Sequence, residues 1–314
     1  MGDIVIKKTF LVTGGTGFIG SEICNRLLKL GYKIIIFDNF SRNKTDLKFD
    51  KKNCQIIKGD ITLVNELNKC FKNKIHAIIH LAYINGTNSF YKKPVEIINV
   101  ALKGLINVFD LAIKYKVKEL YLASSSEVYH HPKIVPTPEN IELKIPDVLN
   151  PRFSYSSGKI MTEIMGVNYG RKYFKKLIIF RPHNVYGSKM GDQHVIPEII
   201  KKIKKSKNNN IEIQGTGLQK RSFIYISDFV DSFELLLKKG KHLNIYNIGN
   251  SRSVRILDLV KKISKALKKK VKIKFNLKIA KGGTHVRCPD ISKITKLGYR
   301  QKISLNDGIS KIIF

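Results

Sequence analysis

Tyr155 and Lys159, in the segment SYSSGKI (154–160), are four residues apart. On a helix this spacing puts both side chains on one face, one turn apart. An ammonium beside a phenol favours the phenolate and lowers the pKa of the tyrosine. Such a tyrosine can take the proton from a hydroxyl group while a hydride leaves the same carbon. The pair by itself is a weak signal, because many surface helices contain Tyr-x-x-x-Lys.

A second group of polar side chains lies in ASSSEVYHH (123–131). Ser125 ends the apolar segment VKELYLAS, which is typical of a buried strand. Ligands of open α/β sheets bind at the carboxyl ends of the strands, so Ser125 can hydrogen-bond the hydroxyl that Tyr155 deprotonates. Glu127 follows two residues later, in a chain where Lys and Arg outnumber Asp and Glu by 58 to 24.

Three glycines, Gly14, Gly17 and Gly20, follow an apolar segment and precede one with helical spacing. Glycine there permits a tight turn, lets the backbone approach a pyrophosphate and lets helix pack on strand. The N-terminus of the helix then stabilises the anion. The segment therefore predicts a dinucleotide-binding turn.

Two acids strengthen this prediction. Asp38 ends the next strand, placed to accept hydrogen bonds from an adenosine ribose. An acid there repels a 2′-phosphate, which favours NAD over NADP, although Arg42 and Lys44 keep NADP open. Asp60 ends a third strand, where it either lies near an adenine or caps a helix.

Apolar segments alternate with amphipathic ones over the first 185 residues, which predicts an α/β fold with a doubly wound parallel sheet. The predicted strands lie in KKTFLVTGG, YKIIIFD, CQIIKGD, HAIIHLA, VKELYLASS and KLIIFRP. Beyond about residue 185 the pattern loosens into shorter, Gly-rich and basic pieces. We expect a dinucleotide-binding domain over 1–185 and a smaller C-terminal lobe over 186–314, with the chain crossing between them.

Composition bounds the class of protein. The 314 residues contain no apolar run of 18, so no transmembrane helix is expected, and MGDIVIKKTF lacks the pattern of a secretory signal. The four cysteines have no CxxC pairing and are expected to be reduced, mostly buried thiols of a cytoplasmic protein. Only 10 of the 58 basic residues behind the net charge of +34 are arginine, and the lysines are spread along the chain. We interpret them as a solvated surface and expect no specific nucleic-acid partner.

Taken together, the motifs resemble the extended short-chain dehydrogenase/reductase family, and within it the nucleotide-sugar epimerase/dehydratase branch. They come in family order over nearly the whole chain: Gly14-x-x-Gly17-x-x-Gly20, Asp38, Asp60, HLA (80–82), Asn99, Ser125, Tyr155-x-x-x-Lys159, RPHNVYG (181–187) and VRCPD (286–290). The resemblance implies a Rossmann domain, a tightly held NAD, a nucleoside-diphosphate sugar between the lobes and a homodimer packed through helices near 95–115 and 155–172. It implies cofactor contacts from Gly14, Gly17, Phe18, Ile19, Asp38, Asn39, Asp60, Ile61, Leu81, Ala82, Asn99, Tyr155 and Lys159.

The resemblance also implies which residues bind substrate. Arg221 and Arg287 would hold the diphosphate, because guanidinium grips phosphates bidentately. The other implied contacts are Ser126, Asn184, His194 and Val195. A solvated loop position is an equal alternative for His194, and for Arg181 a structural ion pair is favoured. His130 and His131 replace the Gly-Asp that often follows the family's Val-Tyr, with no assigned role, and no spacing predicts a metal site.

Family members share oxidation of the sugar at C4 and differ in the steps after it. The family's 4,6-dehydratases carry a glutamate two residues after the catalytic Ser or Thr as the base for C5, and Glu127 has that place. Many of them also carry an aspartate between the two, where this chain has Ser126. Glu127 is therefore a C5 base, a contact to a substrate hydroxyl, or a buried acid paired with a cation.

The function that the resemblance implies is modification of a nucleoside-diphosphate hexose or heptose by 4,6-dehydration or epimerisation, for surface glycan precursors. The alternatives are a 4-dehydrogenase, possibly for GDP-heptose, that releases a 4-keto sugar, and a non-catalytic NAD-binding regulator. UDP-glucuronate decarboxylases share the Ser-Glu pattern but usually have Arg after the lysine, where this chain has Ile160. The base, the sugar and the outcome stay open.

Overall fold

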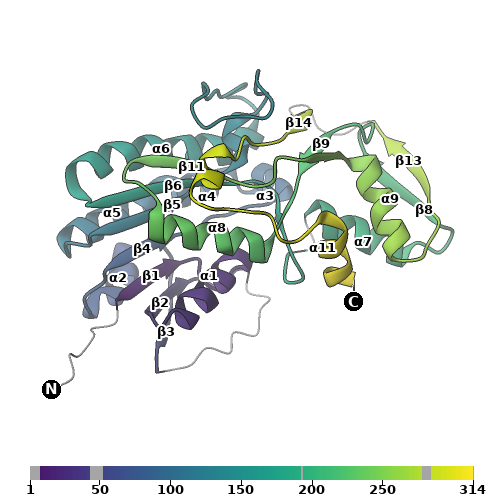
Figure 1. Cartoon of the computed structure of the whole chain (residues 1–314). Helices are drawn as coiled ribbons and strands as arrows, with labels where there is room; N and C mark the ends of the chain where they lie inside the picture. Colours follow the sequence, from purple (N-terminus) through teal and green to yellow (C-terminus); the bar gives the residue numbers. More distant parts are fainter. Residues whose placement is uncertain (1–7, 43–51, 192–193, 278–283, 314) are drawn as a thin grey trace.

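The structure is a computed structural model that describes residues 8–42, 52–191, 194–277 and 284–313 (Figure 1). Lys44 and most of the N-terminal segment MGDIVIKKTF lie outside the described residues.

The larger lobe is built on a seven-stranded sheet in which every neighbouring pair is parallel. Its order is β11-β6-β5-β4-β1-β2-β3. The strands are β1 (Thr9–Thr13), β2 (Lys33–Asp38), β3 (Cys54–Lys58), β4 (Ala77–His80), β5 (Glu119–Ala123), β6 (Lys176–Pro182) and β11 (Asn244–Ile248). The chain winds one way from β1 to β3 and the other way from β4 onward, so the predicted doubly wound parallel sheet is confirmed.

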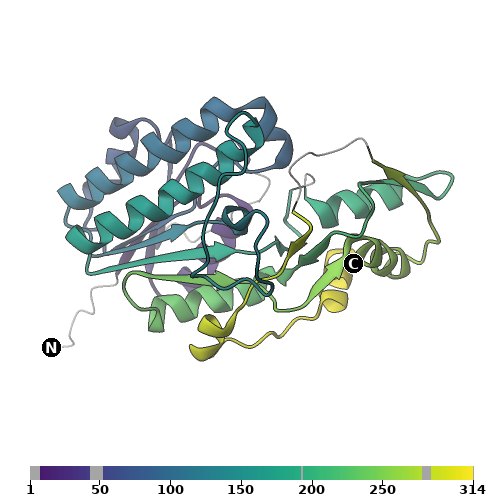
Figure 2. The same cartoon turned by 90° about the horizontal axis from the view of Figure 1, so that it is seen from above.

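Helices cover both faces of this sheet, which is why its central strands are apolar on both sides. Figure 2 shows the layers, with α5 and α6 on one side and α8 on the other. On the first face lie α2 (Val64–Asn68), α4 (Pro94–Asn99), the π-helical turn η2 (Val100–Gly104), α5 (Leu105–Lys114) and α6 (Ser154–Tyr173). On the second face lie α1 (Phe18–Lys29) and α8 (Ile226–Lys239).

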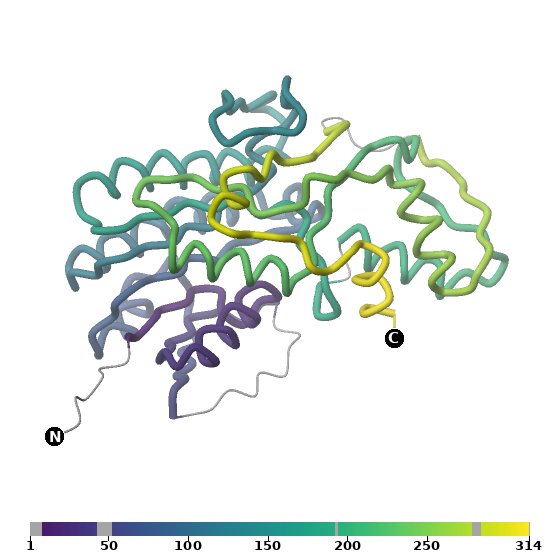
Figure 3. The backbone as a smooth tube through the Cα atoms, in the orientation of Figure 1, coloured from purple at the N-terminus to yellow at the C-terminus, as the bar shows by residue number. Residues whose placement is uncertain are grey.

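The chain passes between the lobes more than once (Figure 3). After β6 it enters the smaller lobe, then returns through α8 to form β11, which pairs with β6. The sheet of the larger lobe thus takes in residues from beyond 185, while the division at that residue stays a prediction. Later, α10 (Ser292–Lys296) packs against β11 before the chain ends in the smaller lobe.

The smaller lobe has its own apolar core, in which helices cover short strand pairs. Its helices are α7 (Val195–Lys205), α9 (Ile256–Ala266) and α11 (Leu305–Ile313). The strand pairs are β8 (Asn210–Gln214) with β13 (Lys272–Asn276), and β7 (Val185–Tyr186) with β10 (Ile224–Tyr225). A third sheet joins β9 (Lys220–Ser222) to β12 (Ser253–Arg255) and β14 (Val286–Arg287).

Two single-turn 3-10 helices lie near the strand ends at the site, η3 (Ser126–Tyr129) after β5 and η4 (Pro151–Phe153) before α6. All four cysteines are buried, as predicted. Within the described ranges, no helix has both the length and the apolarity needed to cross a membrane.

Candidate active site

The glycine turn between β1 and α1 has the close backbone packing that its sequence predicts. Gly14 has a φ of +70°, and a Cβ on it would lie 2.7 Å from the backbone nitrogen of Ala82. A Cβ on Gly20 would overlap the carbonyl oxygen of Gly14. Gly17 is the N-cap of α1, so Phe18 and Ile19 form its first turn. A turn in which three of the residues 14–17 are glycine, ending at a helix N-terminus, fits the pyrophosphate of a dinucleotide.

Asp38 fastens this turn to the end of β2. Its Oδ2 accepts a hydrogen bond from the backbone of Thr16 at 3.0 Å, and its Oδ1 accepts one from Phe40 at 2.9 Å. The carboxylate therefore lies beside the glycine turn, and each oxygen keeps a lone pair for a ribose hydroxyl. Asn39 is exposed beside it. These residues fit the adenosine end of NAD.

The other predicted cofactor residues lie along the same edge of the sheet. Leu81 and Ala82 follow β4, and their backbone nitrogens donate to Thr13. Asp60 follows β3, and its Oδ1 accepts hydrogen bonds from the backbone and hydroxyl of Thr62, each 2.8 Å long. Asp60 thus stabilises the turn before α2 but does not cap that helix, whose N-cap residue is Leu63. The contact of Asp60 with adenine stays a prediction. Ile61 is buried next to it, and Asn99 ends α4 immediately before the π-helical turn.

Tyr155 lies at the start of α6 among aromatic side chains that the local sequence did not predict. Its ring stacks on Phe90 with centroids 4.8 Å apart and meets Tyr83 edge-on at 5.2 Å. Burial raises the pKa of Tyr155 to about 12, although Ser125, which is near enough to act on its hydroxyl, acts to lower it. The site therefore joins the predicted serine and tyrosine.

Lys159 is buried one turn further along α6. Its Nζ donates to the carbonyl oxygen of Ala123 at 2.6 Å and lies 3.7 Å from the centroid of the Tyr83 ring. Burial lowers the pKa of Lys159 to about 7, and the charge of Glu163 opposes this shift. The prediction that the pKa of Tyr155 is lowered is wrong in this structure, because burial dominates at the phenol and the ammonium is held by other groups.

Glu127 pairs with a cation from the other lobe. Its two carboxylate oxygens accept hydrogen bonds from Nη1 and Nη2 of Arg287, at 2.6 and 2.8 Å. Burial acts to raise the pKa of Glu127, but Arg287 outweighs burial and the pKa is lowered. Of the three roles that the sequence left open, the structure displays the paired acid, and the pair joins η3 to β14.

Two more arginines act on this pair. The positive charges of Arg152 and Arg287 lower the pKa of Glu127 and also that of Arg221. Burial is the largest cause of the lowered pKa of Arg221. Arg221 donates to the carbonyl oxygens of Lys220 and His285. Sequence reasoning missed Arg152, although its place three residues before Tyr155 and the scarcity of arginine were available signals. Tyr83 and Phe90 were missed as well.

The remaining predicted substrate residues are spread around this cluster. Ser126 is buried in η3, and Asn184 has its Nδ2 engaged with the carbonyl oxygen of Ser222 at 2.7 Å. His194 is the N-cap residue of α7 and half-buried, and burial and the charge of Arg42 lower its pKa to about 4. Its contact with substrate stays a prediction. Val195 begins α7 and is half-exposed.

Arg181 is buried and forms an ion pair, the structural role that the sequence analysis favoured for it. Its Nε donates to Glu163 Oε1 at 2.8 Å and its Nη2 to Oε2 at 2.5 Å. Ser124 also donates to Glu163, and Arg181 Nη1 donates to the hydroxyl of Tyr129 at 2.6 Å. This network lies beneath the site and connects β6, α6 and η3.

His130 also lies at the site. Its backbone φ is 45°, a value that residues other than glycine rarely adopt. Burial lowers its pKa to about 4, so the imidazole is neutral near pH 7. His131 lies 6.4 Å from His285 between ring centroids. No group of three or more potential metal ligands occurs in the part of the chain that the structure describes.

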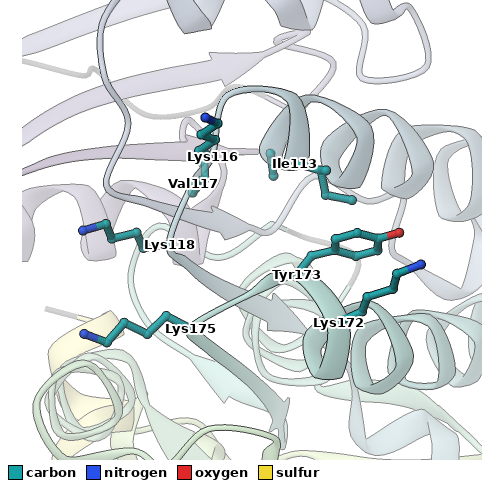
Figure 4. Close-up of a pocket in the computed structure, with 8 residues that line it drawn as sticks. Ile113, Lys116, Val117, Lys118, Lys172, Tyr173 and Lys175 are labelled. Atoms are coloured by element: carbon teal, nitrogen blue, oxygen red, sulfur yellow. The ribbon is translucent and has the colours of Figure 1, made fainter.

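A pocket of about 350 Å³ lies elsewhere, at the amino ends of β5 and β6 (Figure 4). It lies between the end of α5 and the end of α6 and is lined by Ala112, Ile113, Lys116, Val117, Lys118, Lys172, Tyr173 and Lys175. Its lining combines several lysines with a tyrosine but contains no carboxylate, histidine or cysteine. We therefore place the chemistry at the carboxyl edge of the sheet and not here.

Comparison with known proteins agrees with this geometry. The model of the NAD dependent epimerase/dehydratase family matches residues 10–249. A dTDP-D-glucose 4,6-dehydratase of Dictyostelium discoideum is 31% identical over 83% of this chain, which spans 62% of that protein's length. UDP-glucuronic acid decarboxylase 4 of Arabidopsis thaliana is 28% identical over 96% of this chain and 67% of its own length. The crystal structure of UDP-glucose 4-epimerase from Thermotoga maritima, with UDP-glucose, has a TM-score of 0.87 and 26% identity over 97% of both chains.

The fold and the glycine turn thus define a member of the extended short-chain dehydrogenase/reductases. The chain belongs to the NAD dependent epimerase/dehydratase family, and NAD is its cofactor.

Proposed function

We propose that this protein oxidises C4 of a nucleoside-diphosphate hexose or heptose, and that Ser125, Tyr155 and Lys159 carry this step. The observation that supports it best is that Ser125, just beyond the carboxyl end of β5, lies near enough to act on the Tyr155 hydroxyl. The glycine turn lies at the carboxyl end of β1, two strands away in the same parallel sheet. Reactant and cofactor sites therefore share one edge.

Each side chain has a distinct task. Ser125 Oγ holds the C4 hydroxyl, and Tyr155 Oη takes its proton. Because the pKa of Tyr155 is about 12, the phenolate needs further stabilisation, and Lys159 is the cation that α6 supplies one turn away. NAD, when bound, supplies the oxidant that accepts a hydride from C4. The glycine turn, Asp38, Asp60 and Asn99, with their predicted neighbours, would hold it.

The substrate end is supported by charge. Arg221 and Arg287 lie together in the smaller lobe, where β9 pairs with β14. We assign them to the diphosphate, and Ser126, Asn184, His194 and Val195 to the sugar and nucleotide. Three guanidiniums near one carboxylate leave this region with a net positive charge, which favours an anionic ligand.

We further propose that the ketone at C4 is used within the site, for 4,6-dehydration or epimerisation, with Glu127 as the base at C5. A ketone acidifies the neighbouring C–H bond, so a carboxylate can remove that proton. A second outcome, release of the 4-keto sugar by a 4-dehydrogenase, is favoured by the Glu127–Arg287 pair, because a carboxylate with a lowered pKa is a weaker base.

The decisive experiment is mass spectrometry of the products from UDP-, GDP-, dTDP- and CDP-sugars in D₂O. Loss of water with gain of one deuterium indicates a dehydratase, and gain without loss of water indicates an epimerase acting at C5. Loss of two hydrogens without deuterium at C5 indicates a 4-dehydrogenase and contradicts Glu127 as base. If no sugar reacts while NAD still binds, the protein is a regulator and the proposal is wrong.

Tyr155→Phe tests the first step. Removing the hydroxyl should slow reduction of NAD⁺ by substrate about 10²- to 10⁴-fold, the usual effect of a positioned acid–base group. Tyr91→Phe, at an exposed tyrosine of α3 (Thr87–Lys92), is the matched control and should leave this rate unchanged. Equal rates for the two variants would contradict the role of Tyr155.

A further inference from the structure

The contacts of Arg287 limit how an anion can reach it. Nη1 and Nη2 both bind Glu127, and Nη2 also donates to Thr284 Oγ1 at 3.1 Å. Nε is buried and has no hydrogen-bond partner among the described residues. The edge of the guanidinium that includes Nε is therefore closed to a ligand in this conformation.

Burial points to the same conclusion. The Arg287 side chain is 8% exposed, whereas that of Glu127 is 22% exposed. An incoming ligand meets the carboxylate before it meets the guanidinium. A diphosphate can bind Arg287 in this arrangement by taking over the terminal nitrogens that Glu127 now holds.

The local charges favour such an exchange. Arg152, Arg221 and Arg287 act on Glu127, which is one negative charge among three positive ones. The excess of two positive charges matches the two negative charges of a sugar diphosphate diester. Two guanidiniums could then bind the diphosphate bidentately.

We propose that Glu127 occupies the place of the substrate's diphosphate on Arg287, and that binding of a nucleoside-diphosphate sugar displaces the carboxylate and frees it to act as the base. This inference rests on the proposed function. It makes Glu127 a base only when substrate is present, because the paired carboxylate is held by Arg287.

The exchange also sets the proton balance. In the pair, Arg287 lowers the pKa of Glu127. Once Arg287 binds the diphosphate instead, burial acts to raise that pKa. After C4 has been oxidised, the C5–H bond breaks, its electron pair stays next to the ketone, and the proton goes to a Glu127 oxygen. The same carboxylate thus serves first as a counter-ion and then as a proton acceptor.

Affinity is the first test. Glu127→Gln removes the competing charge, so each nucleoside-diphosphate sugar that binds should bind the variant about fivefold more tightly or better in calorimetry. Glu142→Gln is the control: it removes a negative charge from an exposed pair with Lys144 and should not change the affinity. If Glu127 only held Arg287 in position, Glu127→Gln would bind more weakly, and that result would overturn the inference.

Proton uptake is the second test. Pairing with Arg287 lowers the pKa of Glu127 and release from Arg287 raises it again, so binding takes up protons between the two values and affinity rises as pH falls through that window. The groups that act on Glu127 or are acted on by it are Arg287 and Arg221 from the smaller lobe, Arg152 from η4, Tyr155 from α6 and His130 from η3's end. Of these groups, His130 has the pKa closest to this window. The Glu127→Gln variant retains His130, so proton uptake by the variant is an internal control.

Calorimetry at pH 5–6 in buffers of different ionisation enthalpy counts these protons, since the diphosphate diester itself does not titrate there. The wild type should take up as much as about one proton more than Glu127→Gln. Equal uptake by both proteins would overturn the inference and leave the proposed function standing. Failure of every sugar nucleotide to bind either protein would overturn the proposed function, and the inference with it.

Discussion

At the scale of single residues, burial decides the charges of the site. Tyr155 and Lys159 have the spacing that predicts a low tyrosine pKa, yet the pKa of Tyr155 is raised and that of Lys159 falls to about 7. Both shifts disfavour the charged form, as expected when a side chain loses water. The spacing brings the two residues to one face of α6, but Ala123 and Tyr83 hold the ammonium.

The lowered pKa of Lys159 makes a prediction about stability. In the unfolded chain the pKa of lysine is near 10.4, so the unfolded chain binds more protons than the folded chain between about pH 7 and pH 10. The unfavourable contribution of Lys159 to the stability of the folded chain therefore becomes smaller as pH rises. The free energy of unfolding of the wild type, relative to Lys159→Met, should increase over this range by as much as about 1.4 kcal/mol per pH unit. Denaturant titrations of both proteins from pH 7 to pH 10 measure it.

The neighbours of Lys159 do not obscure this difference. The pKa of His80 is about 3 and that of Tyr155 about 12, so neither titrates in the range. If this difference in the free energy of unfolding stays constant or falls as pH rises, the pKa of Lys159 is not lowered in the folded protein.

At the scale of elements, α6 positions the site through the close approach of its glycines. A Cβ on Gly158 would overlap the hydroxyl of Tyr83 and lie 2.7 Å from Cβ of Ala101, in the π-helical turn η2. The missing side chain therefore lets η2 and Tyr83 pack against the helix that carries Tyr155 and Lys159. A π-helical turn within a helix frequently occurs at functional sites.

Gly158→Ala tests this packing. Alanine is favoured over glycine by about 1 kcal/mol in a helix, but overpacking typically costs about 1–3 kcal/mol. Since Ala101 belongs to a neighbouring helix and cannot swing away, we expect the free energy of unfolding to decrease. Ser157→Ala, the adjacent position, gains helix propensity without added volume and should not destabilise the protein. A more stable Gly158→Ala protein in chemical denaturation would refute the close approach.

At the scale of the whole molecule, the outer surface of α4, α5 and α6 exposes a group of apolar side chains. They are Val95, Ile98, Ile106, Met161 and Ile164, between 39% and 65% exposed. Figure 2 shows α5 and α6 side by side on the outside of the sheet, and α4 contacts α6. Clustered exposed apolar residues mark interaction surfaces. We propose that a second copy of the chain covers this surface in a homodimer.

The dimer can be tested by light scattering after gel filtration. The wild type should have twice the chain mass of 35.8 kDa, and Ile98→Glu combined with Ile164→Glu should have the monomer mass, because burying two carboxylates in an apolar interface is costly. Leu149→Glu, at a residue that is 89% exposed in the segment before α6, is the control and should remain dimeric. A monomeric wild type across a wide concentration range would contradict the proposal.

The sequence by itself determined the sheet, the glycine turn with Asp38, and that Ser125 and Tyr155 lie near each other. These features follow from local patterns: apolar segments between helices must be buried strands, and the ends of parallel strands meet at one edge. Arg181 could likewise be assigned to an ion pair. The tertiary structure alone decided the partners of the charged groups. Glu127 and Arg287 are 160 residues apart in sequence, and Phe90 reaches Tyr155 from a separate helix. Such contacts depend on how the lobes and helices pack, and burial, which sets the pKa values of Tyr155 and Lys159, exists only in the folded chain.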